Sequence, residues 1–346
     1  MKILLTGHTG YIGSVLGPML QRAGHVVMGL DAGYFAHCTL GDPPPLPGWQ
    51  SDVRDVATEL VRGYDAVVHL AALSNDPLGN LDPDLTREIN HVASVRLARA
   101  AKAAGVPRFV FASSCSLYGV AGTGMLDESA QFNPITPYGE SKVFVERDVA
   151  VLADDDFSPT FMRNATAYGV SPRLRADVVV NNLVGYAFTT GEVLIQSDGT
   201  PWRPLVHVED LSRAVLAVLA APREKVHNQA FNVGRTSENY RVRDLADLVQ
   251  TLVPGSRVRY ASDVGPDPRS YRVDCGKLEE TLPDYQPTWT VERGIRELRD
   301  AFDQHGLTEL QFLSDRYFRI KQIQTLQRDG RLSADLRWLS RARVPA

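Results

Sequence analysis

The sequence is poor in the features that mark disulfide-bonded, metal-binding and membrane proteins. It has three cysteines, Cys38, Cys115 and Cys275, which are odd in number and widely spaced. Such a set predicts neither a disulfide framework nor a zinc site. The eight histidines form no HxH or HExxH pattern and no carboxylate cluster, so we expect no metal. No run approaches the ~18 apolar residues of a membrane helix.

The chain also lacks a large excess of charge. Its 41 acidic and 37 basic residues give a formal net charge of −4, which provides no electrostatic reason to expect a nucleic-acid or anionic-membrane partner. The hydrophobic share of 44% and the charged share of 23% are those of a soluble globular protein. The first residues, Met1–Gly7, enter a strand pattern directly and have no signal-peptide layout, so we expect a cytoplasmic protein.

The first half alternates short apolar runs with helix-length segments, which predicts an α/β fold with a parallel sheet of βαβ units. Strands are expected at Lys2–Thr6, Val26–Leu30, Ala66–Leu70, Arg108–Ser113 and Thr160–Asn164. Helices are expected near residues 11–23, 54–62, 85–105 and 139–153.

After about Ser171 the elements become shorter and turns more frequent, which indicates a smaller α+β lobe. The helix Glu209–Leu219 and the strand Ala230–Val233 are expected to return to the first sheet. We therefore predict a first domain over 1–170 with returning segments at about 205–235, and a lobe over 171–204 and 236–346. From about Gln304 the chain carries a helical tail, either a docking helix at a subunit interface or, as we favour, a solvated helix packed on the lobe.

A glycine-rich turn, Gly7-His8-Thr9-Gly10-Tyr11-Ile12-Gly13, lies between the first strand and the first helix. Small residues there let the backbone approach a pyrophosphate at the helix N-terminus, although many such turns bind nothing. Asp31 ends the second strand about twenty residues later, where its carboxylate would accept hydrogen bonds from an adenosine ribose and repel a 2′-phosphate. The alternative for Asp31 is a solvated turn residue.

Two further segments belong to the predicted dinucleotide site. Asp52 and Val53 are placed to hold an adenine, although Asp52 is equally suited to cap the following helix. Leu70, Ala71 and Ala72 close a strand with small residues over which a dinucleotide can lie, and buried packing alone explains them nearly as well.

The strongest pattern combines a serine-rich strand end, Ser113-Ser114-Cys115-Ser116, with Tyr138 and Lys142 downstream. Residues at i and i+4 share a helix face. A nearby ammonium favours the phenolate, so we expect Lys142 to lower the pKa of Tyr138 and prepare it for proton transfer. The Ser114 hydroxyl can hydrogen-bond the same substrate oxygen. Cys115 is expected to be a small buried apolar residue, since no histidine lies nearby in the sequence to activate it.

Together these motifs resemble the extended short-chain dehydrogenases/reductases, and within them the nucleotide-sugar epimerases and dehydratases. The resemblance runs from Gly7 to about Trp289. It implies a Rossmann-like doubly wound parallel sheet with a smaller C-terminal α+β substrate lobe, an NAD cofactor, and a homodimer built through a four-helix bundle. Ser114, Tyr138 and Lys142 match the catalytic positions. The residues that would hold NAD are Gly7, Gly10, Tyr11, Ile12, Asp31, Asp52, Val53, Leu70, Ala71, Ala72, Asn90, Ser113, Tyr138 and Lys142.

The second lobe carries segments that resemble the family's substrate site. The resemblance assigns substrate binding to Ser114, Thr166, Asn182, Leu183, Arg203, Arg269 and Tyr271. Arg203 stands four residues before His207, in the place of an arginine that clamps a phosphate, for which a guanidinium is well suited. Arg269, within Asp267–Tyr271, resembles a second clamp, with a structural role equally open. His207 and Asp210 are also consistent with a purely structural role in orienting the returning helix.

Departures from the family bear on the reaction. Sugar 4,6-dehydratases resemble one another in a Thr-Asp-Glu set where this chain has Ser114-Cys115-Ser116, and decarboxylases in a Glu at the position of Ser116. Both classes are disfavoured here because no carboxylic acid is present there. Thr166 stands where many epimerases have Asn, which weakens a direct transfer of the hexose 4-epimerase assignment.

The sequence therefore predicts NAD-dependent hydride transfer at a ring carbon of a nucleoside-diphosphate sugar, with C4 epimerisation favoured. A 4-keto nucleotide-sugar reductase is the alternative, because it would use the same residues and consume the cofactor. A non-catalytic NAD(H)-binding protein is less well supported, because such a protein does not need Ser114, Tyr138 and Lys142 together.

Overall fold

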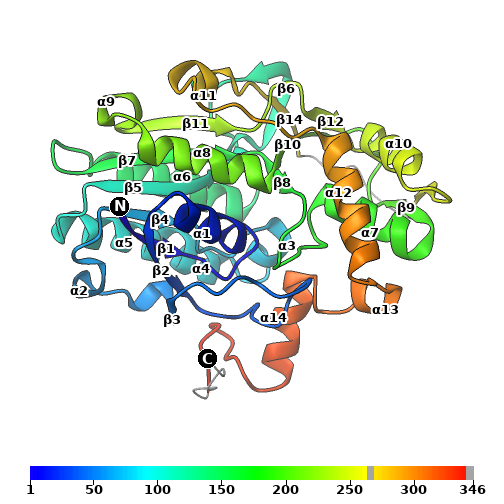
Figure 1. Cartoon of the computed structure of the whole chain (residues 1–346), viewed down its shortest axis with the longest axis horizontal. Coiled ribbons are helices and arrows are strands. Elements are labelled where there is room, and N and C mark those ends of the chain that lie inside the picture. Colours follow the sequence, from blue (N-terminus) through cyan, green and yellow to red (C-terminus); the bar gives the residue numbers. More distant parts are fainter. Residues whose placement is uncertain (263–268, 340–346) are drawn as a thin grey trace.

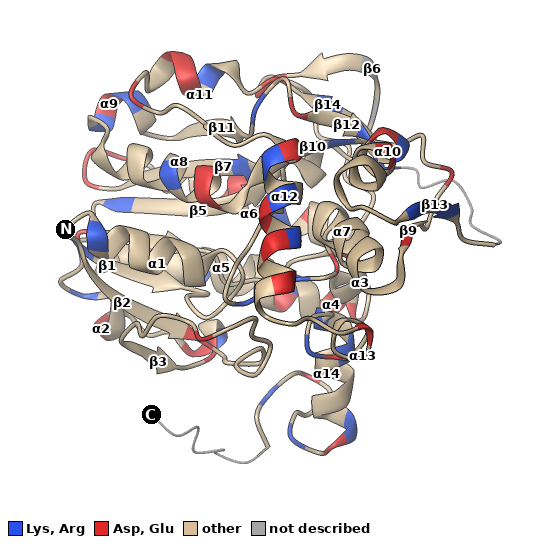
Figure 2. Ribbon diagram, turned by 45° about the vertical axis from the view of Figure 1, so that its right-hand side comes forward, with Lys and Arg blue, Asp and Glu red and all other residues tan. Residues whose placement is uncertain are grey.

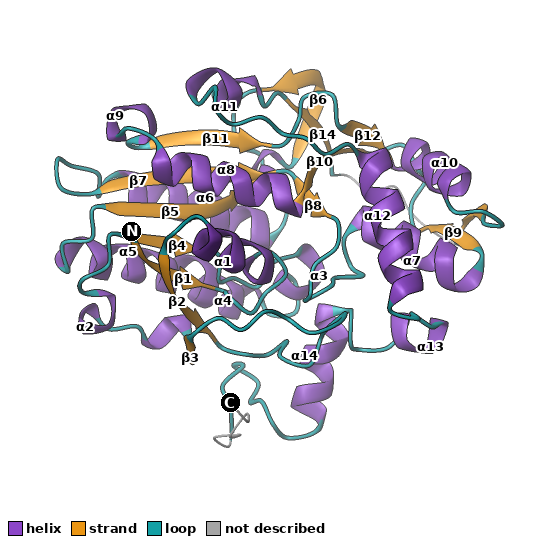
Figure 3. Cartoon of the chain, in the orientation of Figure 1, coloured by secondary structure: helices purple, strands orange, loops and turns teal. Residues whose placement is uncertain are grey.

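A seven-stranded parallel sheet forms the centre of the structure, a computed structural model that describes residues 1–262 and 269–339 (Figures 1 and 3). Its strands follow the order β11-β7-β5-β4-β1-β2-β3. Their bounds are β1 (Lys2–Thr6), β2 (Val26–Asp31), β3 (Gly48–Gln50), β4 (Ala66–His69), β5 (Arg108–Ser114), β7 (Ser158–Asn164) and β11 (Gln229–Val233). The chain starts in the middle of the sheet and winds to both edges, so the doubly wound fold is confirmed.

Helices cover both faces of this sheet because successive strand residues point to opposite sides. Ile3 and Leu5 of β1 pack under α1 (Gly13–Arg22) and α8 (Val208–Ala220), whereas Leu4 packs on the opposite side with α5 (Ala93–Ala103) and α6 (Pro137–Ala150). Shorter helical pieces complete this half: η1 (Val53–Asp55), α2 (Thr58–Val61), α3 (Asp76–Gly79), α4 (Pro83–Thr86), η2 (Arg87–Val92), η3 (Cys115–Tyr118) and α9 (Arg223–Val226). Two later helices also pack on this half, α11 (Gly276–Thr281) and α14 (Arg319–Arg328).

The remaining elements form a smaller lobe with its own apolar core. Its helices are α7 (Val179–Thr190), α10 (Val242–Leu252), α12 (Val291–Gln304) and α13 (Glu309–Phe312). Its strands, in small separate sheets, are β6 (Val120–Leu126), β8 (Thr166–Tyr168), β9 (Glu192–Ile195), β10 (Trp202–His207), β12 (Asn239–Arg241), β13 (Arg257–Tyr260) and β14 (Ser270–Val273). Figure 2 shows both signs of charge on α12, whose buried stripe of Ile295, Leu298 and Phe302 joins the lobe's core.

All five predicted strands are present, and β11 pairs in parallel with β7 while α8 packs on α1, as the returning segments predict. The helix predicted over 54–62 is instead two short pieces, η1 and α2. The helix predicted over 85–105 is present and contains the π-helical segment η2. The edge strand β3 was not predicted, because its three exposed residues show no apolar run.

The prediction that the whole tail packs on the lobe is wrong for its second half. Phe312 of α13 does enter the lobe's core, against α7. Beyond it, Ile323 and Leu326 of α14, followed by Leu336, join the core of the first domain beside Tyr34. The tail is therefore two helices joined by a turn, and it crosses from the lobe to the side of the large sheet on which β2 and the edge strand β3 lie (Figure 1).

An ion pair buried beneath the sheet's carboxyl end joins α6 to β7. The Arg163 guanidinium donates to both Glu146 carboxylate oxygens at 2.7–3.1 Å, and both side chains are less than a tenth exposed. Ser113 of β5 donates its hydroxyl to the same carboxylate at 2.5 Å. Removing one member of such a pair leaves the other charge buried without compensation.

We expect Glu146→Ala to lower the free energy of unfolding by about 3–5 kcal/mol, because Arg163 would lose its counter-ion in a buried position. The matched control is Glu292→Ala, whose i,i+4 pair with Arg296 is half exposed; it should cost at most about 1 kcal/mol. Urea unfolding followed by circular dichroism measures both. Equal losses in the two variants would contradict the role assigned to the buried pair.

Candidate active site

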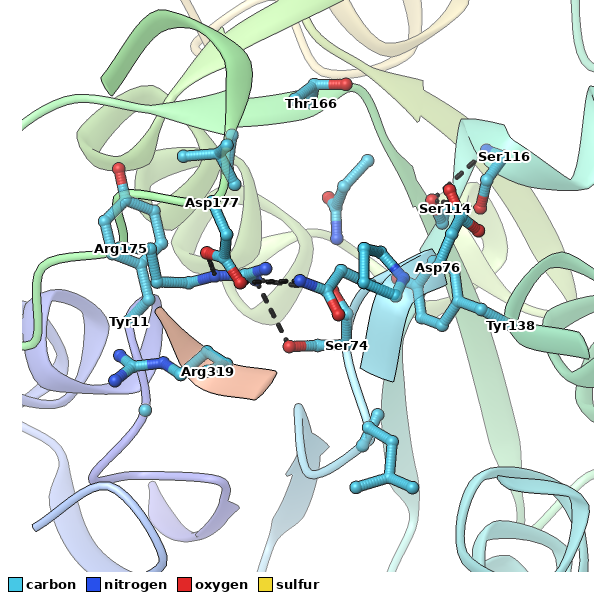
Figure 4. A pocket seen from close by; sticks show the side chains of 18 of the residues that line it. Tyr11, Ser74, Asp76, Ser114, Ser116, Tyr138, Thr166, Arg175, Asp177 and Arg319 are labelled. Carbon is cyan, nitrogen blue, oxygen red and sulfur yellow. Dashed lines mark hydrogen bonds and ion pairs between the residues drawn. The ribbon is translucent and has the colours of Figure 1, made fainter. Parts of the chain in front are cut away.

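A cavity of about 610 Å³ lies at the carboxyl ends of the parallel strands, where ligands of open α/β sheets bind. Its wall is built by the β1–α1 turn, the ends of β2, β4 and β5, the start of α6 and several segments of the smaller lobe. Figure 4 shows its side chains converging from both halves of the molecule.

The glycine turn forms one wall of the cavity and packs too tightly for larger residues. Gly7 has φ +75°, and a Cβ there would lie 2.8 Å from the Ala71 amide nitrogen; a Cβ at Gly13 would lie 2.2 Å from the Gly7 carbonyl oxygen. Gly7, Gly10, Tyr11 and Ile12 all line the cavity, as predicted. The Tyr11 hydroxyl points away, donating to the Gly169 carbonyl at 2.7 Å, so this side chain also clasps the turn to the lobe.

Asp31 lines the cavity at the end of β2. Its two oxygens accept backbone hydrogen bonds from Thr9 and Gly33, at 3.2 and 2.7 Å. Each carboxylate oxygen retains a further lone pair with which to accept a bond from a ligand hydroxyl. Asp52 caps η1, because its carboxylate accepts from the Arg54 amide at 2.8 Å. It also lines the cavity beside Val53, and its contact with an adenine stays a prediction.

At the end of β4 the small residues line the cavity, whereas Asn90, which was predicted to contact the cofactor, does not. Leu70, Ala71 and Ala72 line the cavity. Asn90 is 1% exposed and is not part of the cavity wall; its amide accepts from the Leu73 nitrogen at 2.8 Å and donates to the Leu73 oxygen at 3.1 Å. Its cofactor-binding assignment is therefore corrected to a positioning role, in which it fixes the loop after β4.

Tyr138 and Lys142 lie one turn apart on α6 and face the end of β5. The Lys142 ammonium donates to the Ala112 carbonyl at 2.7 Å and lies 5.5 Å from the centre of the Tyr138 ring. Ser114 is the last residue of β5, and its hydroxyl oxygen accepts from the Ser116 hydroxyl at 2.8 Å. The structure thus brings Ser114, Tyr138 and Lys142 together on one side of the cavity.

Burial dominates the electrostatics of this group. It lowers the pKa of Lys142 to about 7, partly offset by the charge of Glu146. It also raises the pKa of Tyr138 to about 12, although a hydrogen bond with Ser114 acts in the opposite direction. The expectation that the pKa of Tyr138 is lowered is therefore not met here, because loss of solvent around the phenol raises this pKa more than the Ser114 hydrogen bond and the charge of Arg175 lower it.

The neighbours of Ser114 on the serine-rich segment are engaged in packing. Ser113 lines the cavity but donates its hydroxyl to Glu146. Cys115 is 1% exposed, its thiol contacts the Arg163 carbonyl at 3.1 Å, and burial holds its pKa well above the usual thiol range. Its predicted role as a buried apolar residue is confirmed.

The predicted substrate residues of the lobe all line the same cavity: Thr166, Asn182, Leu183, Arg203, Arg269 and Tyr271. Asn182 also anchors the preceding loop, donating to the Ala176 carbonyl at 2.7 Å. Asp267 and Pro268, from the same predicted segment as Arg269, lie outside the described residues. Asp210 has a structural role, because its carboxylate accepts hydrogen bonds from the backbone nitrogens of Thr288 and Trp289.

His207 lies outside this cavity. It stacks on Trp289 with ring centres 3.7 Å apart and pairs with Glu297 at 2.9 Å, which supports the structural interpretation.

Four charged residues of the cavity were not found from the sequence: Asp76, Arg175, Asp177 and Arg319. Asp76, the first residue of α3, accepts from the Thr136 hydroxyl at 2.6 Å and pairs with Arg269. Arg175 pairs with Asp177 at 2.8 Å. No local sequence motif marks these residues: Asp76 begins the short helix α3, Arg175 and Asp177 lie in a loop, and Arg319 begins α14 in the tail.

The residues present fit a dinucleotide. The glycine turn offers backbone close to the N-terminus of α1, where phosphate groups are favourably bound. Asp31 offers acceptors for a ribose diol. Buried arginine nitrogens without a hydrogen-bond partner, Arg175 Nη2 and Arg319 Nη1, supply cationic donors on the same cavity. Among the described residues, no cluster of three or more His, Cys, Asp or Glu is arranged to hold a metal, and none of the helices suits a membrane crossing.

Comparison with known proteins places these features in a family. The model of the NAD dependent epimerase/dehydratase family matches residues 3–234. A UDP-glucose 4-epimerase of Lactobacillus helveticus is 30% identical over 304 residues, covering 82% of this chain and 91% of the relative. MoeE5 in complex with UDP-glucuronic acid and NAD has a TM-score of 0.77 at 27% identity, covering 88% of this chain and 99% of its own. A UDP-glucose 4-epimerase of Thermotoga maritima with UDP-glucose has a TM-score of 0.76 at 25% identity, with the same coverage.

The cofactor is NAD. We expect Asp31 to make NAD bind more tightly than NADP by about 2–4 kcal/mol. The 2′-phosphate of NADP would remove the hydrogen bonds between the ribose and the carboxylate, and its charge would be repelled by the charge of Asp31. Asp31→Asn should reduce the ratio of NAD affinity to NADP affinity by about tenfold or more, because the charge that faces the 2′-phosphate is removed. Calorimetric titration with both cofactors measures it. Asp42→Asn, an exposed change, is the control. Equal affinity of the native protein for NAD and NADP would refute the role of Asp31.

Proposed function

We propose that this chain, which belongs to the NAD dependent epimerase/dehydratase family, inverts the configuration at C4 of a nucleoside-diphosphate hexose whose nucleotide is UDP. It is an NAD-dependent enzyme of the extended short-chain dehydrogenase type that acts on nucleotide sugars by hydride transfer. The observation that carries the proposal is the convergence of Ser114, Tyr138 and Lys142 on one wall of the cavity. UDP is proposed because the relatives act on or bind UDP-sugars.

The side chains provide proton transfer, while NAD, when bound, supplies the acceptor and later the donor of the hydride. Tyr138 takes the proton of the C4 hydroxyl, and Ser114 hydrogen-bonds the same oxygen as it becomes a carbonyl. Tyr138 accepts this proton in its phenolate form, and the phenol that results returns the proton to the same oxygen when C4 is reduced from the other face. Lys142 fixes α6 against β5. In its protonated, ammonium form it also stabilises the Tyr138 phenolate.

The serine-rich segment at the end of β5 offers no carboxylic acid to expel a C6 hydroxyl. Ser114-Cys115-Ser116 provides none, and the carboxylate of Asp76 is engaged by Thr136 and Arg269. This supports epimerisation over dehydration.

A 4-keto nucleotide-sugar reductase is the second candidate, because it would use the same three side chains. It differs in releasing the oxidised cofactor in every turnover, whereas an epimerase regenerates NAD within its own cycle. The preference for NAD that Asp31 provides supports the epimerase. The homodimer, the cytoplasmic location and the division into a first domain over 1–170 with returning segments and a lobe stay predictions.

The reaction type is tested by incubating the purified protein with UDP-galactose and with UDP-glucuronic acid in the absence of added cofactor. We expect one of them to be converted to its C4 epimer with no net change in absorbance near 340 nm, because the hydride returns to the substrate. Chromatography of the nucleotide sugars provides the readout. Inertness toward both, combined with NADH consumption on a UDP-4-keto-6-deoxyhexose, would replace epimerisation by ketoreduction.

The catalytic assignment is tested by Tyr138→Phe, which should lower kcat by about 10²–10⁴-fold and leave NAD affinity almost unchanged, because only the proton-transferring hydroxyl is lost. Ser114→Ala should have a smaller effect. Cys115→Ala is the matched control within the same segment and should leave kcat nearly intact, because its thiol is buried. A larger loss in Cys115→Ala than in the other two would show that the roles along β5 are wrongly assigned.

A further inference from the structure

Arg319, at the start of α14, is a buried cation with an unused donor. Its side chain is 2% exposed, and one guanidinium nitrogen, Nη2, donates to the Arg173 carbonyl at 2.8 Å. The guanidinium lies over the ring of Phe35, 4.4 Å from its centre. The other terminal nitrogen, Nη1, has no hydrogen-bond partner. Burial lowers the pKa of this group. A guanidinium held in this way requires an anion to compensate its desolvation.

The position of Arg319 identifies where that anion would bind. Arg319 and the glycine turn line the same cavity. They are also connected through one short segment, because the Ser171 hydroxyl donates to the Tyr11 carbonyl at 2.8 Å and Arg319 donates to Arg173 two residues later. Figure 4 shows the Arg319 side chain reaching from α14 toward the backbone of Tyr11. The unused donor therefore belongs to a residue that lines the same cavity as the N-terminus of α1, where a phosphate is favoured.

A second buried guanidinium supports the same conclusion. Arg175 has its Nη1 on the Ser74 carbonyl and hydroxyl and its Nε on Asp177, while Nη2 lacks a partner. Arg175 also lines the cavity. Two buried cations with one neighbouring carboxylate, Asp177, leave an excess of positive charge that a diphosphate would neutralise.

We propose that Arg319 binds the diphosphate of NAD. The second half of the C-terminal tail, residues 316–338, then forms part of the cofactor site and is not an appendage of the lobe. Phe318, Arg319 and Ile320 form a wall of the cavity, opposite the large sheet's own cofactor residues. The proposal concerns cofactor binding and does not depend on which carbon of the sugar reacts.

The tail's remaining contacts favour the dinucleotide over the sugar nucleotide as the source of the diphosphate. After α14 the chain lies along the segment that contains Asp31 and Asp52, the predicted adenosine end of the site. Trp338 Nε1 donates to the Ala32 carbonyl at 2.7 Å, and the Tyr34 hydroxyl donates to the Leu336 carbonyl at 2.5 Å. These contacts hold α14 beside the half of the cavity that the first domain builds.

The lengths of related structures agree with an added element. The structure of MoeE5 with UDP-glucuronic acid and NAD is covered to 99%, whereas 88% of this chain is covered. This chain therefore carries sequence beyond that shared with this neighbour.

The test compares the affinities of Arg319→Gln, Arg319→Lys and the native protein for NAD and for UDP by calorimetric titration. The glutamine variant should bind NAD roughly 10- to 100-fold more weakly, as expected for loss of a hydrogen bond to a charged group. The lysine variant should fall between, because it keeps the charge and loses the planar fork. UDP affinity should be unchanged in both. Arg328→Gln, with a largely exposed side chain on the same helix, is the control and should match the native protein.

Three outcomes would overturn the proposal. Unchanged NAD affinity in the glutamine variant would show that Arg319 does not bind the cofactor. Weaker binding of UDP with NAD unaffected would assign the residue to the sugar nucleotide. Equal NAD affinity in the lysine and glutamine variants would show that the charge is irrelevant and that the residue only packs. Because these are binding measurements, failure of the epimerase assay would not affect them.

A measurement on the native protein keeps the proposal testable if the variants fail to fold. We expect saturating NAD to slow amide hydrogen exchange in α14 as well as in the glycine turn, because both would contact one ligand. UDP alone should leave α14 unchanged. Protection of the glycine turn by NAD without any change in α14 would refute the proposal.

Discussion

The buried ammonium of Lys142 is the contact on which the arrangement of the active site depends. It binds the Ala112 carbonyl at 2.7 Å and lies over the Phe111 ring, so it joins α6 to the end of β5. One turn before it on the same face stands Tyr138, and one turn after it stands Glu146, which receives the Ser113 hydroxyl. A stripe of three side chains spaced by four residues thus fixes the helix against the strand, and the distance between Tyr138 and Ser114 follows from that packing.

The parts of this arrangement that the sequence predicted are those encoded locally. The apolar strands, the glycine turn and the i,i+4 pair of Tyr138 and Lys142 are each readable within a few residues, and all lie as predicted. Arg175 and Arg319 were missed because their roles arise only when segments distant in sequence meet. Asn90 was assigned by position alone, which could not reveal that both its amide atoms serve Leu73. The tyrosine pKa was predicted in the wrong direction because the sequence showed the charged neighbour and not the depth of burial.

The net charge of the chain and the charged residues of its cavity bear on different kinds of ligand. A net charge of −4 argued against anionic macromolecules as partners, since it describes the long-range field. Within the cavity, however, Arg175, Arg203 and Arg319 line a space that must receive diphosphate groups. At such short range buried donors act with little screening, so local placement decides which ligand binds. Small anionic ligands are therefore compatible with an acidic protein.

The tail and the proposed reaction support each other on kinetic grounds. An epimerase returns the hydride to its own substrate, so the cofactor never has to leave, and contacts of the kind proposed for Arg319 with a bound cofactor do not slow turnover. A ketoreductase must release the oxidised cofactor in every cycle. A segment held by Trp338, the Leu336 carbonyl and an ion pair of Arg337 with Asp55 at 2.5 Å would then have to open each time. Because those contacts hold residues 336–338 against the segments that follow β2 and β3, a tail that binds the cofactor is better suited to the reaction that leaves the cofactor in place.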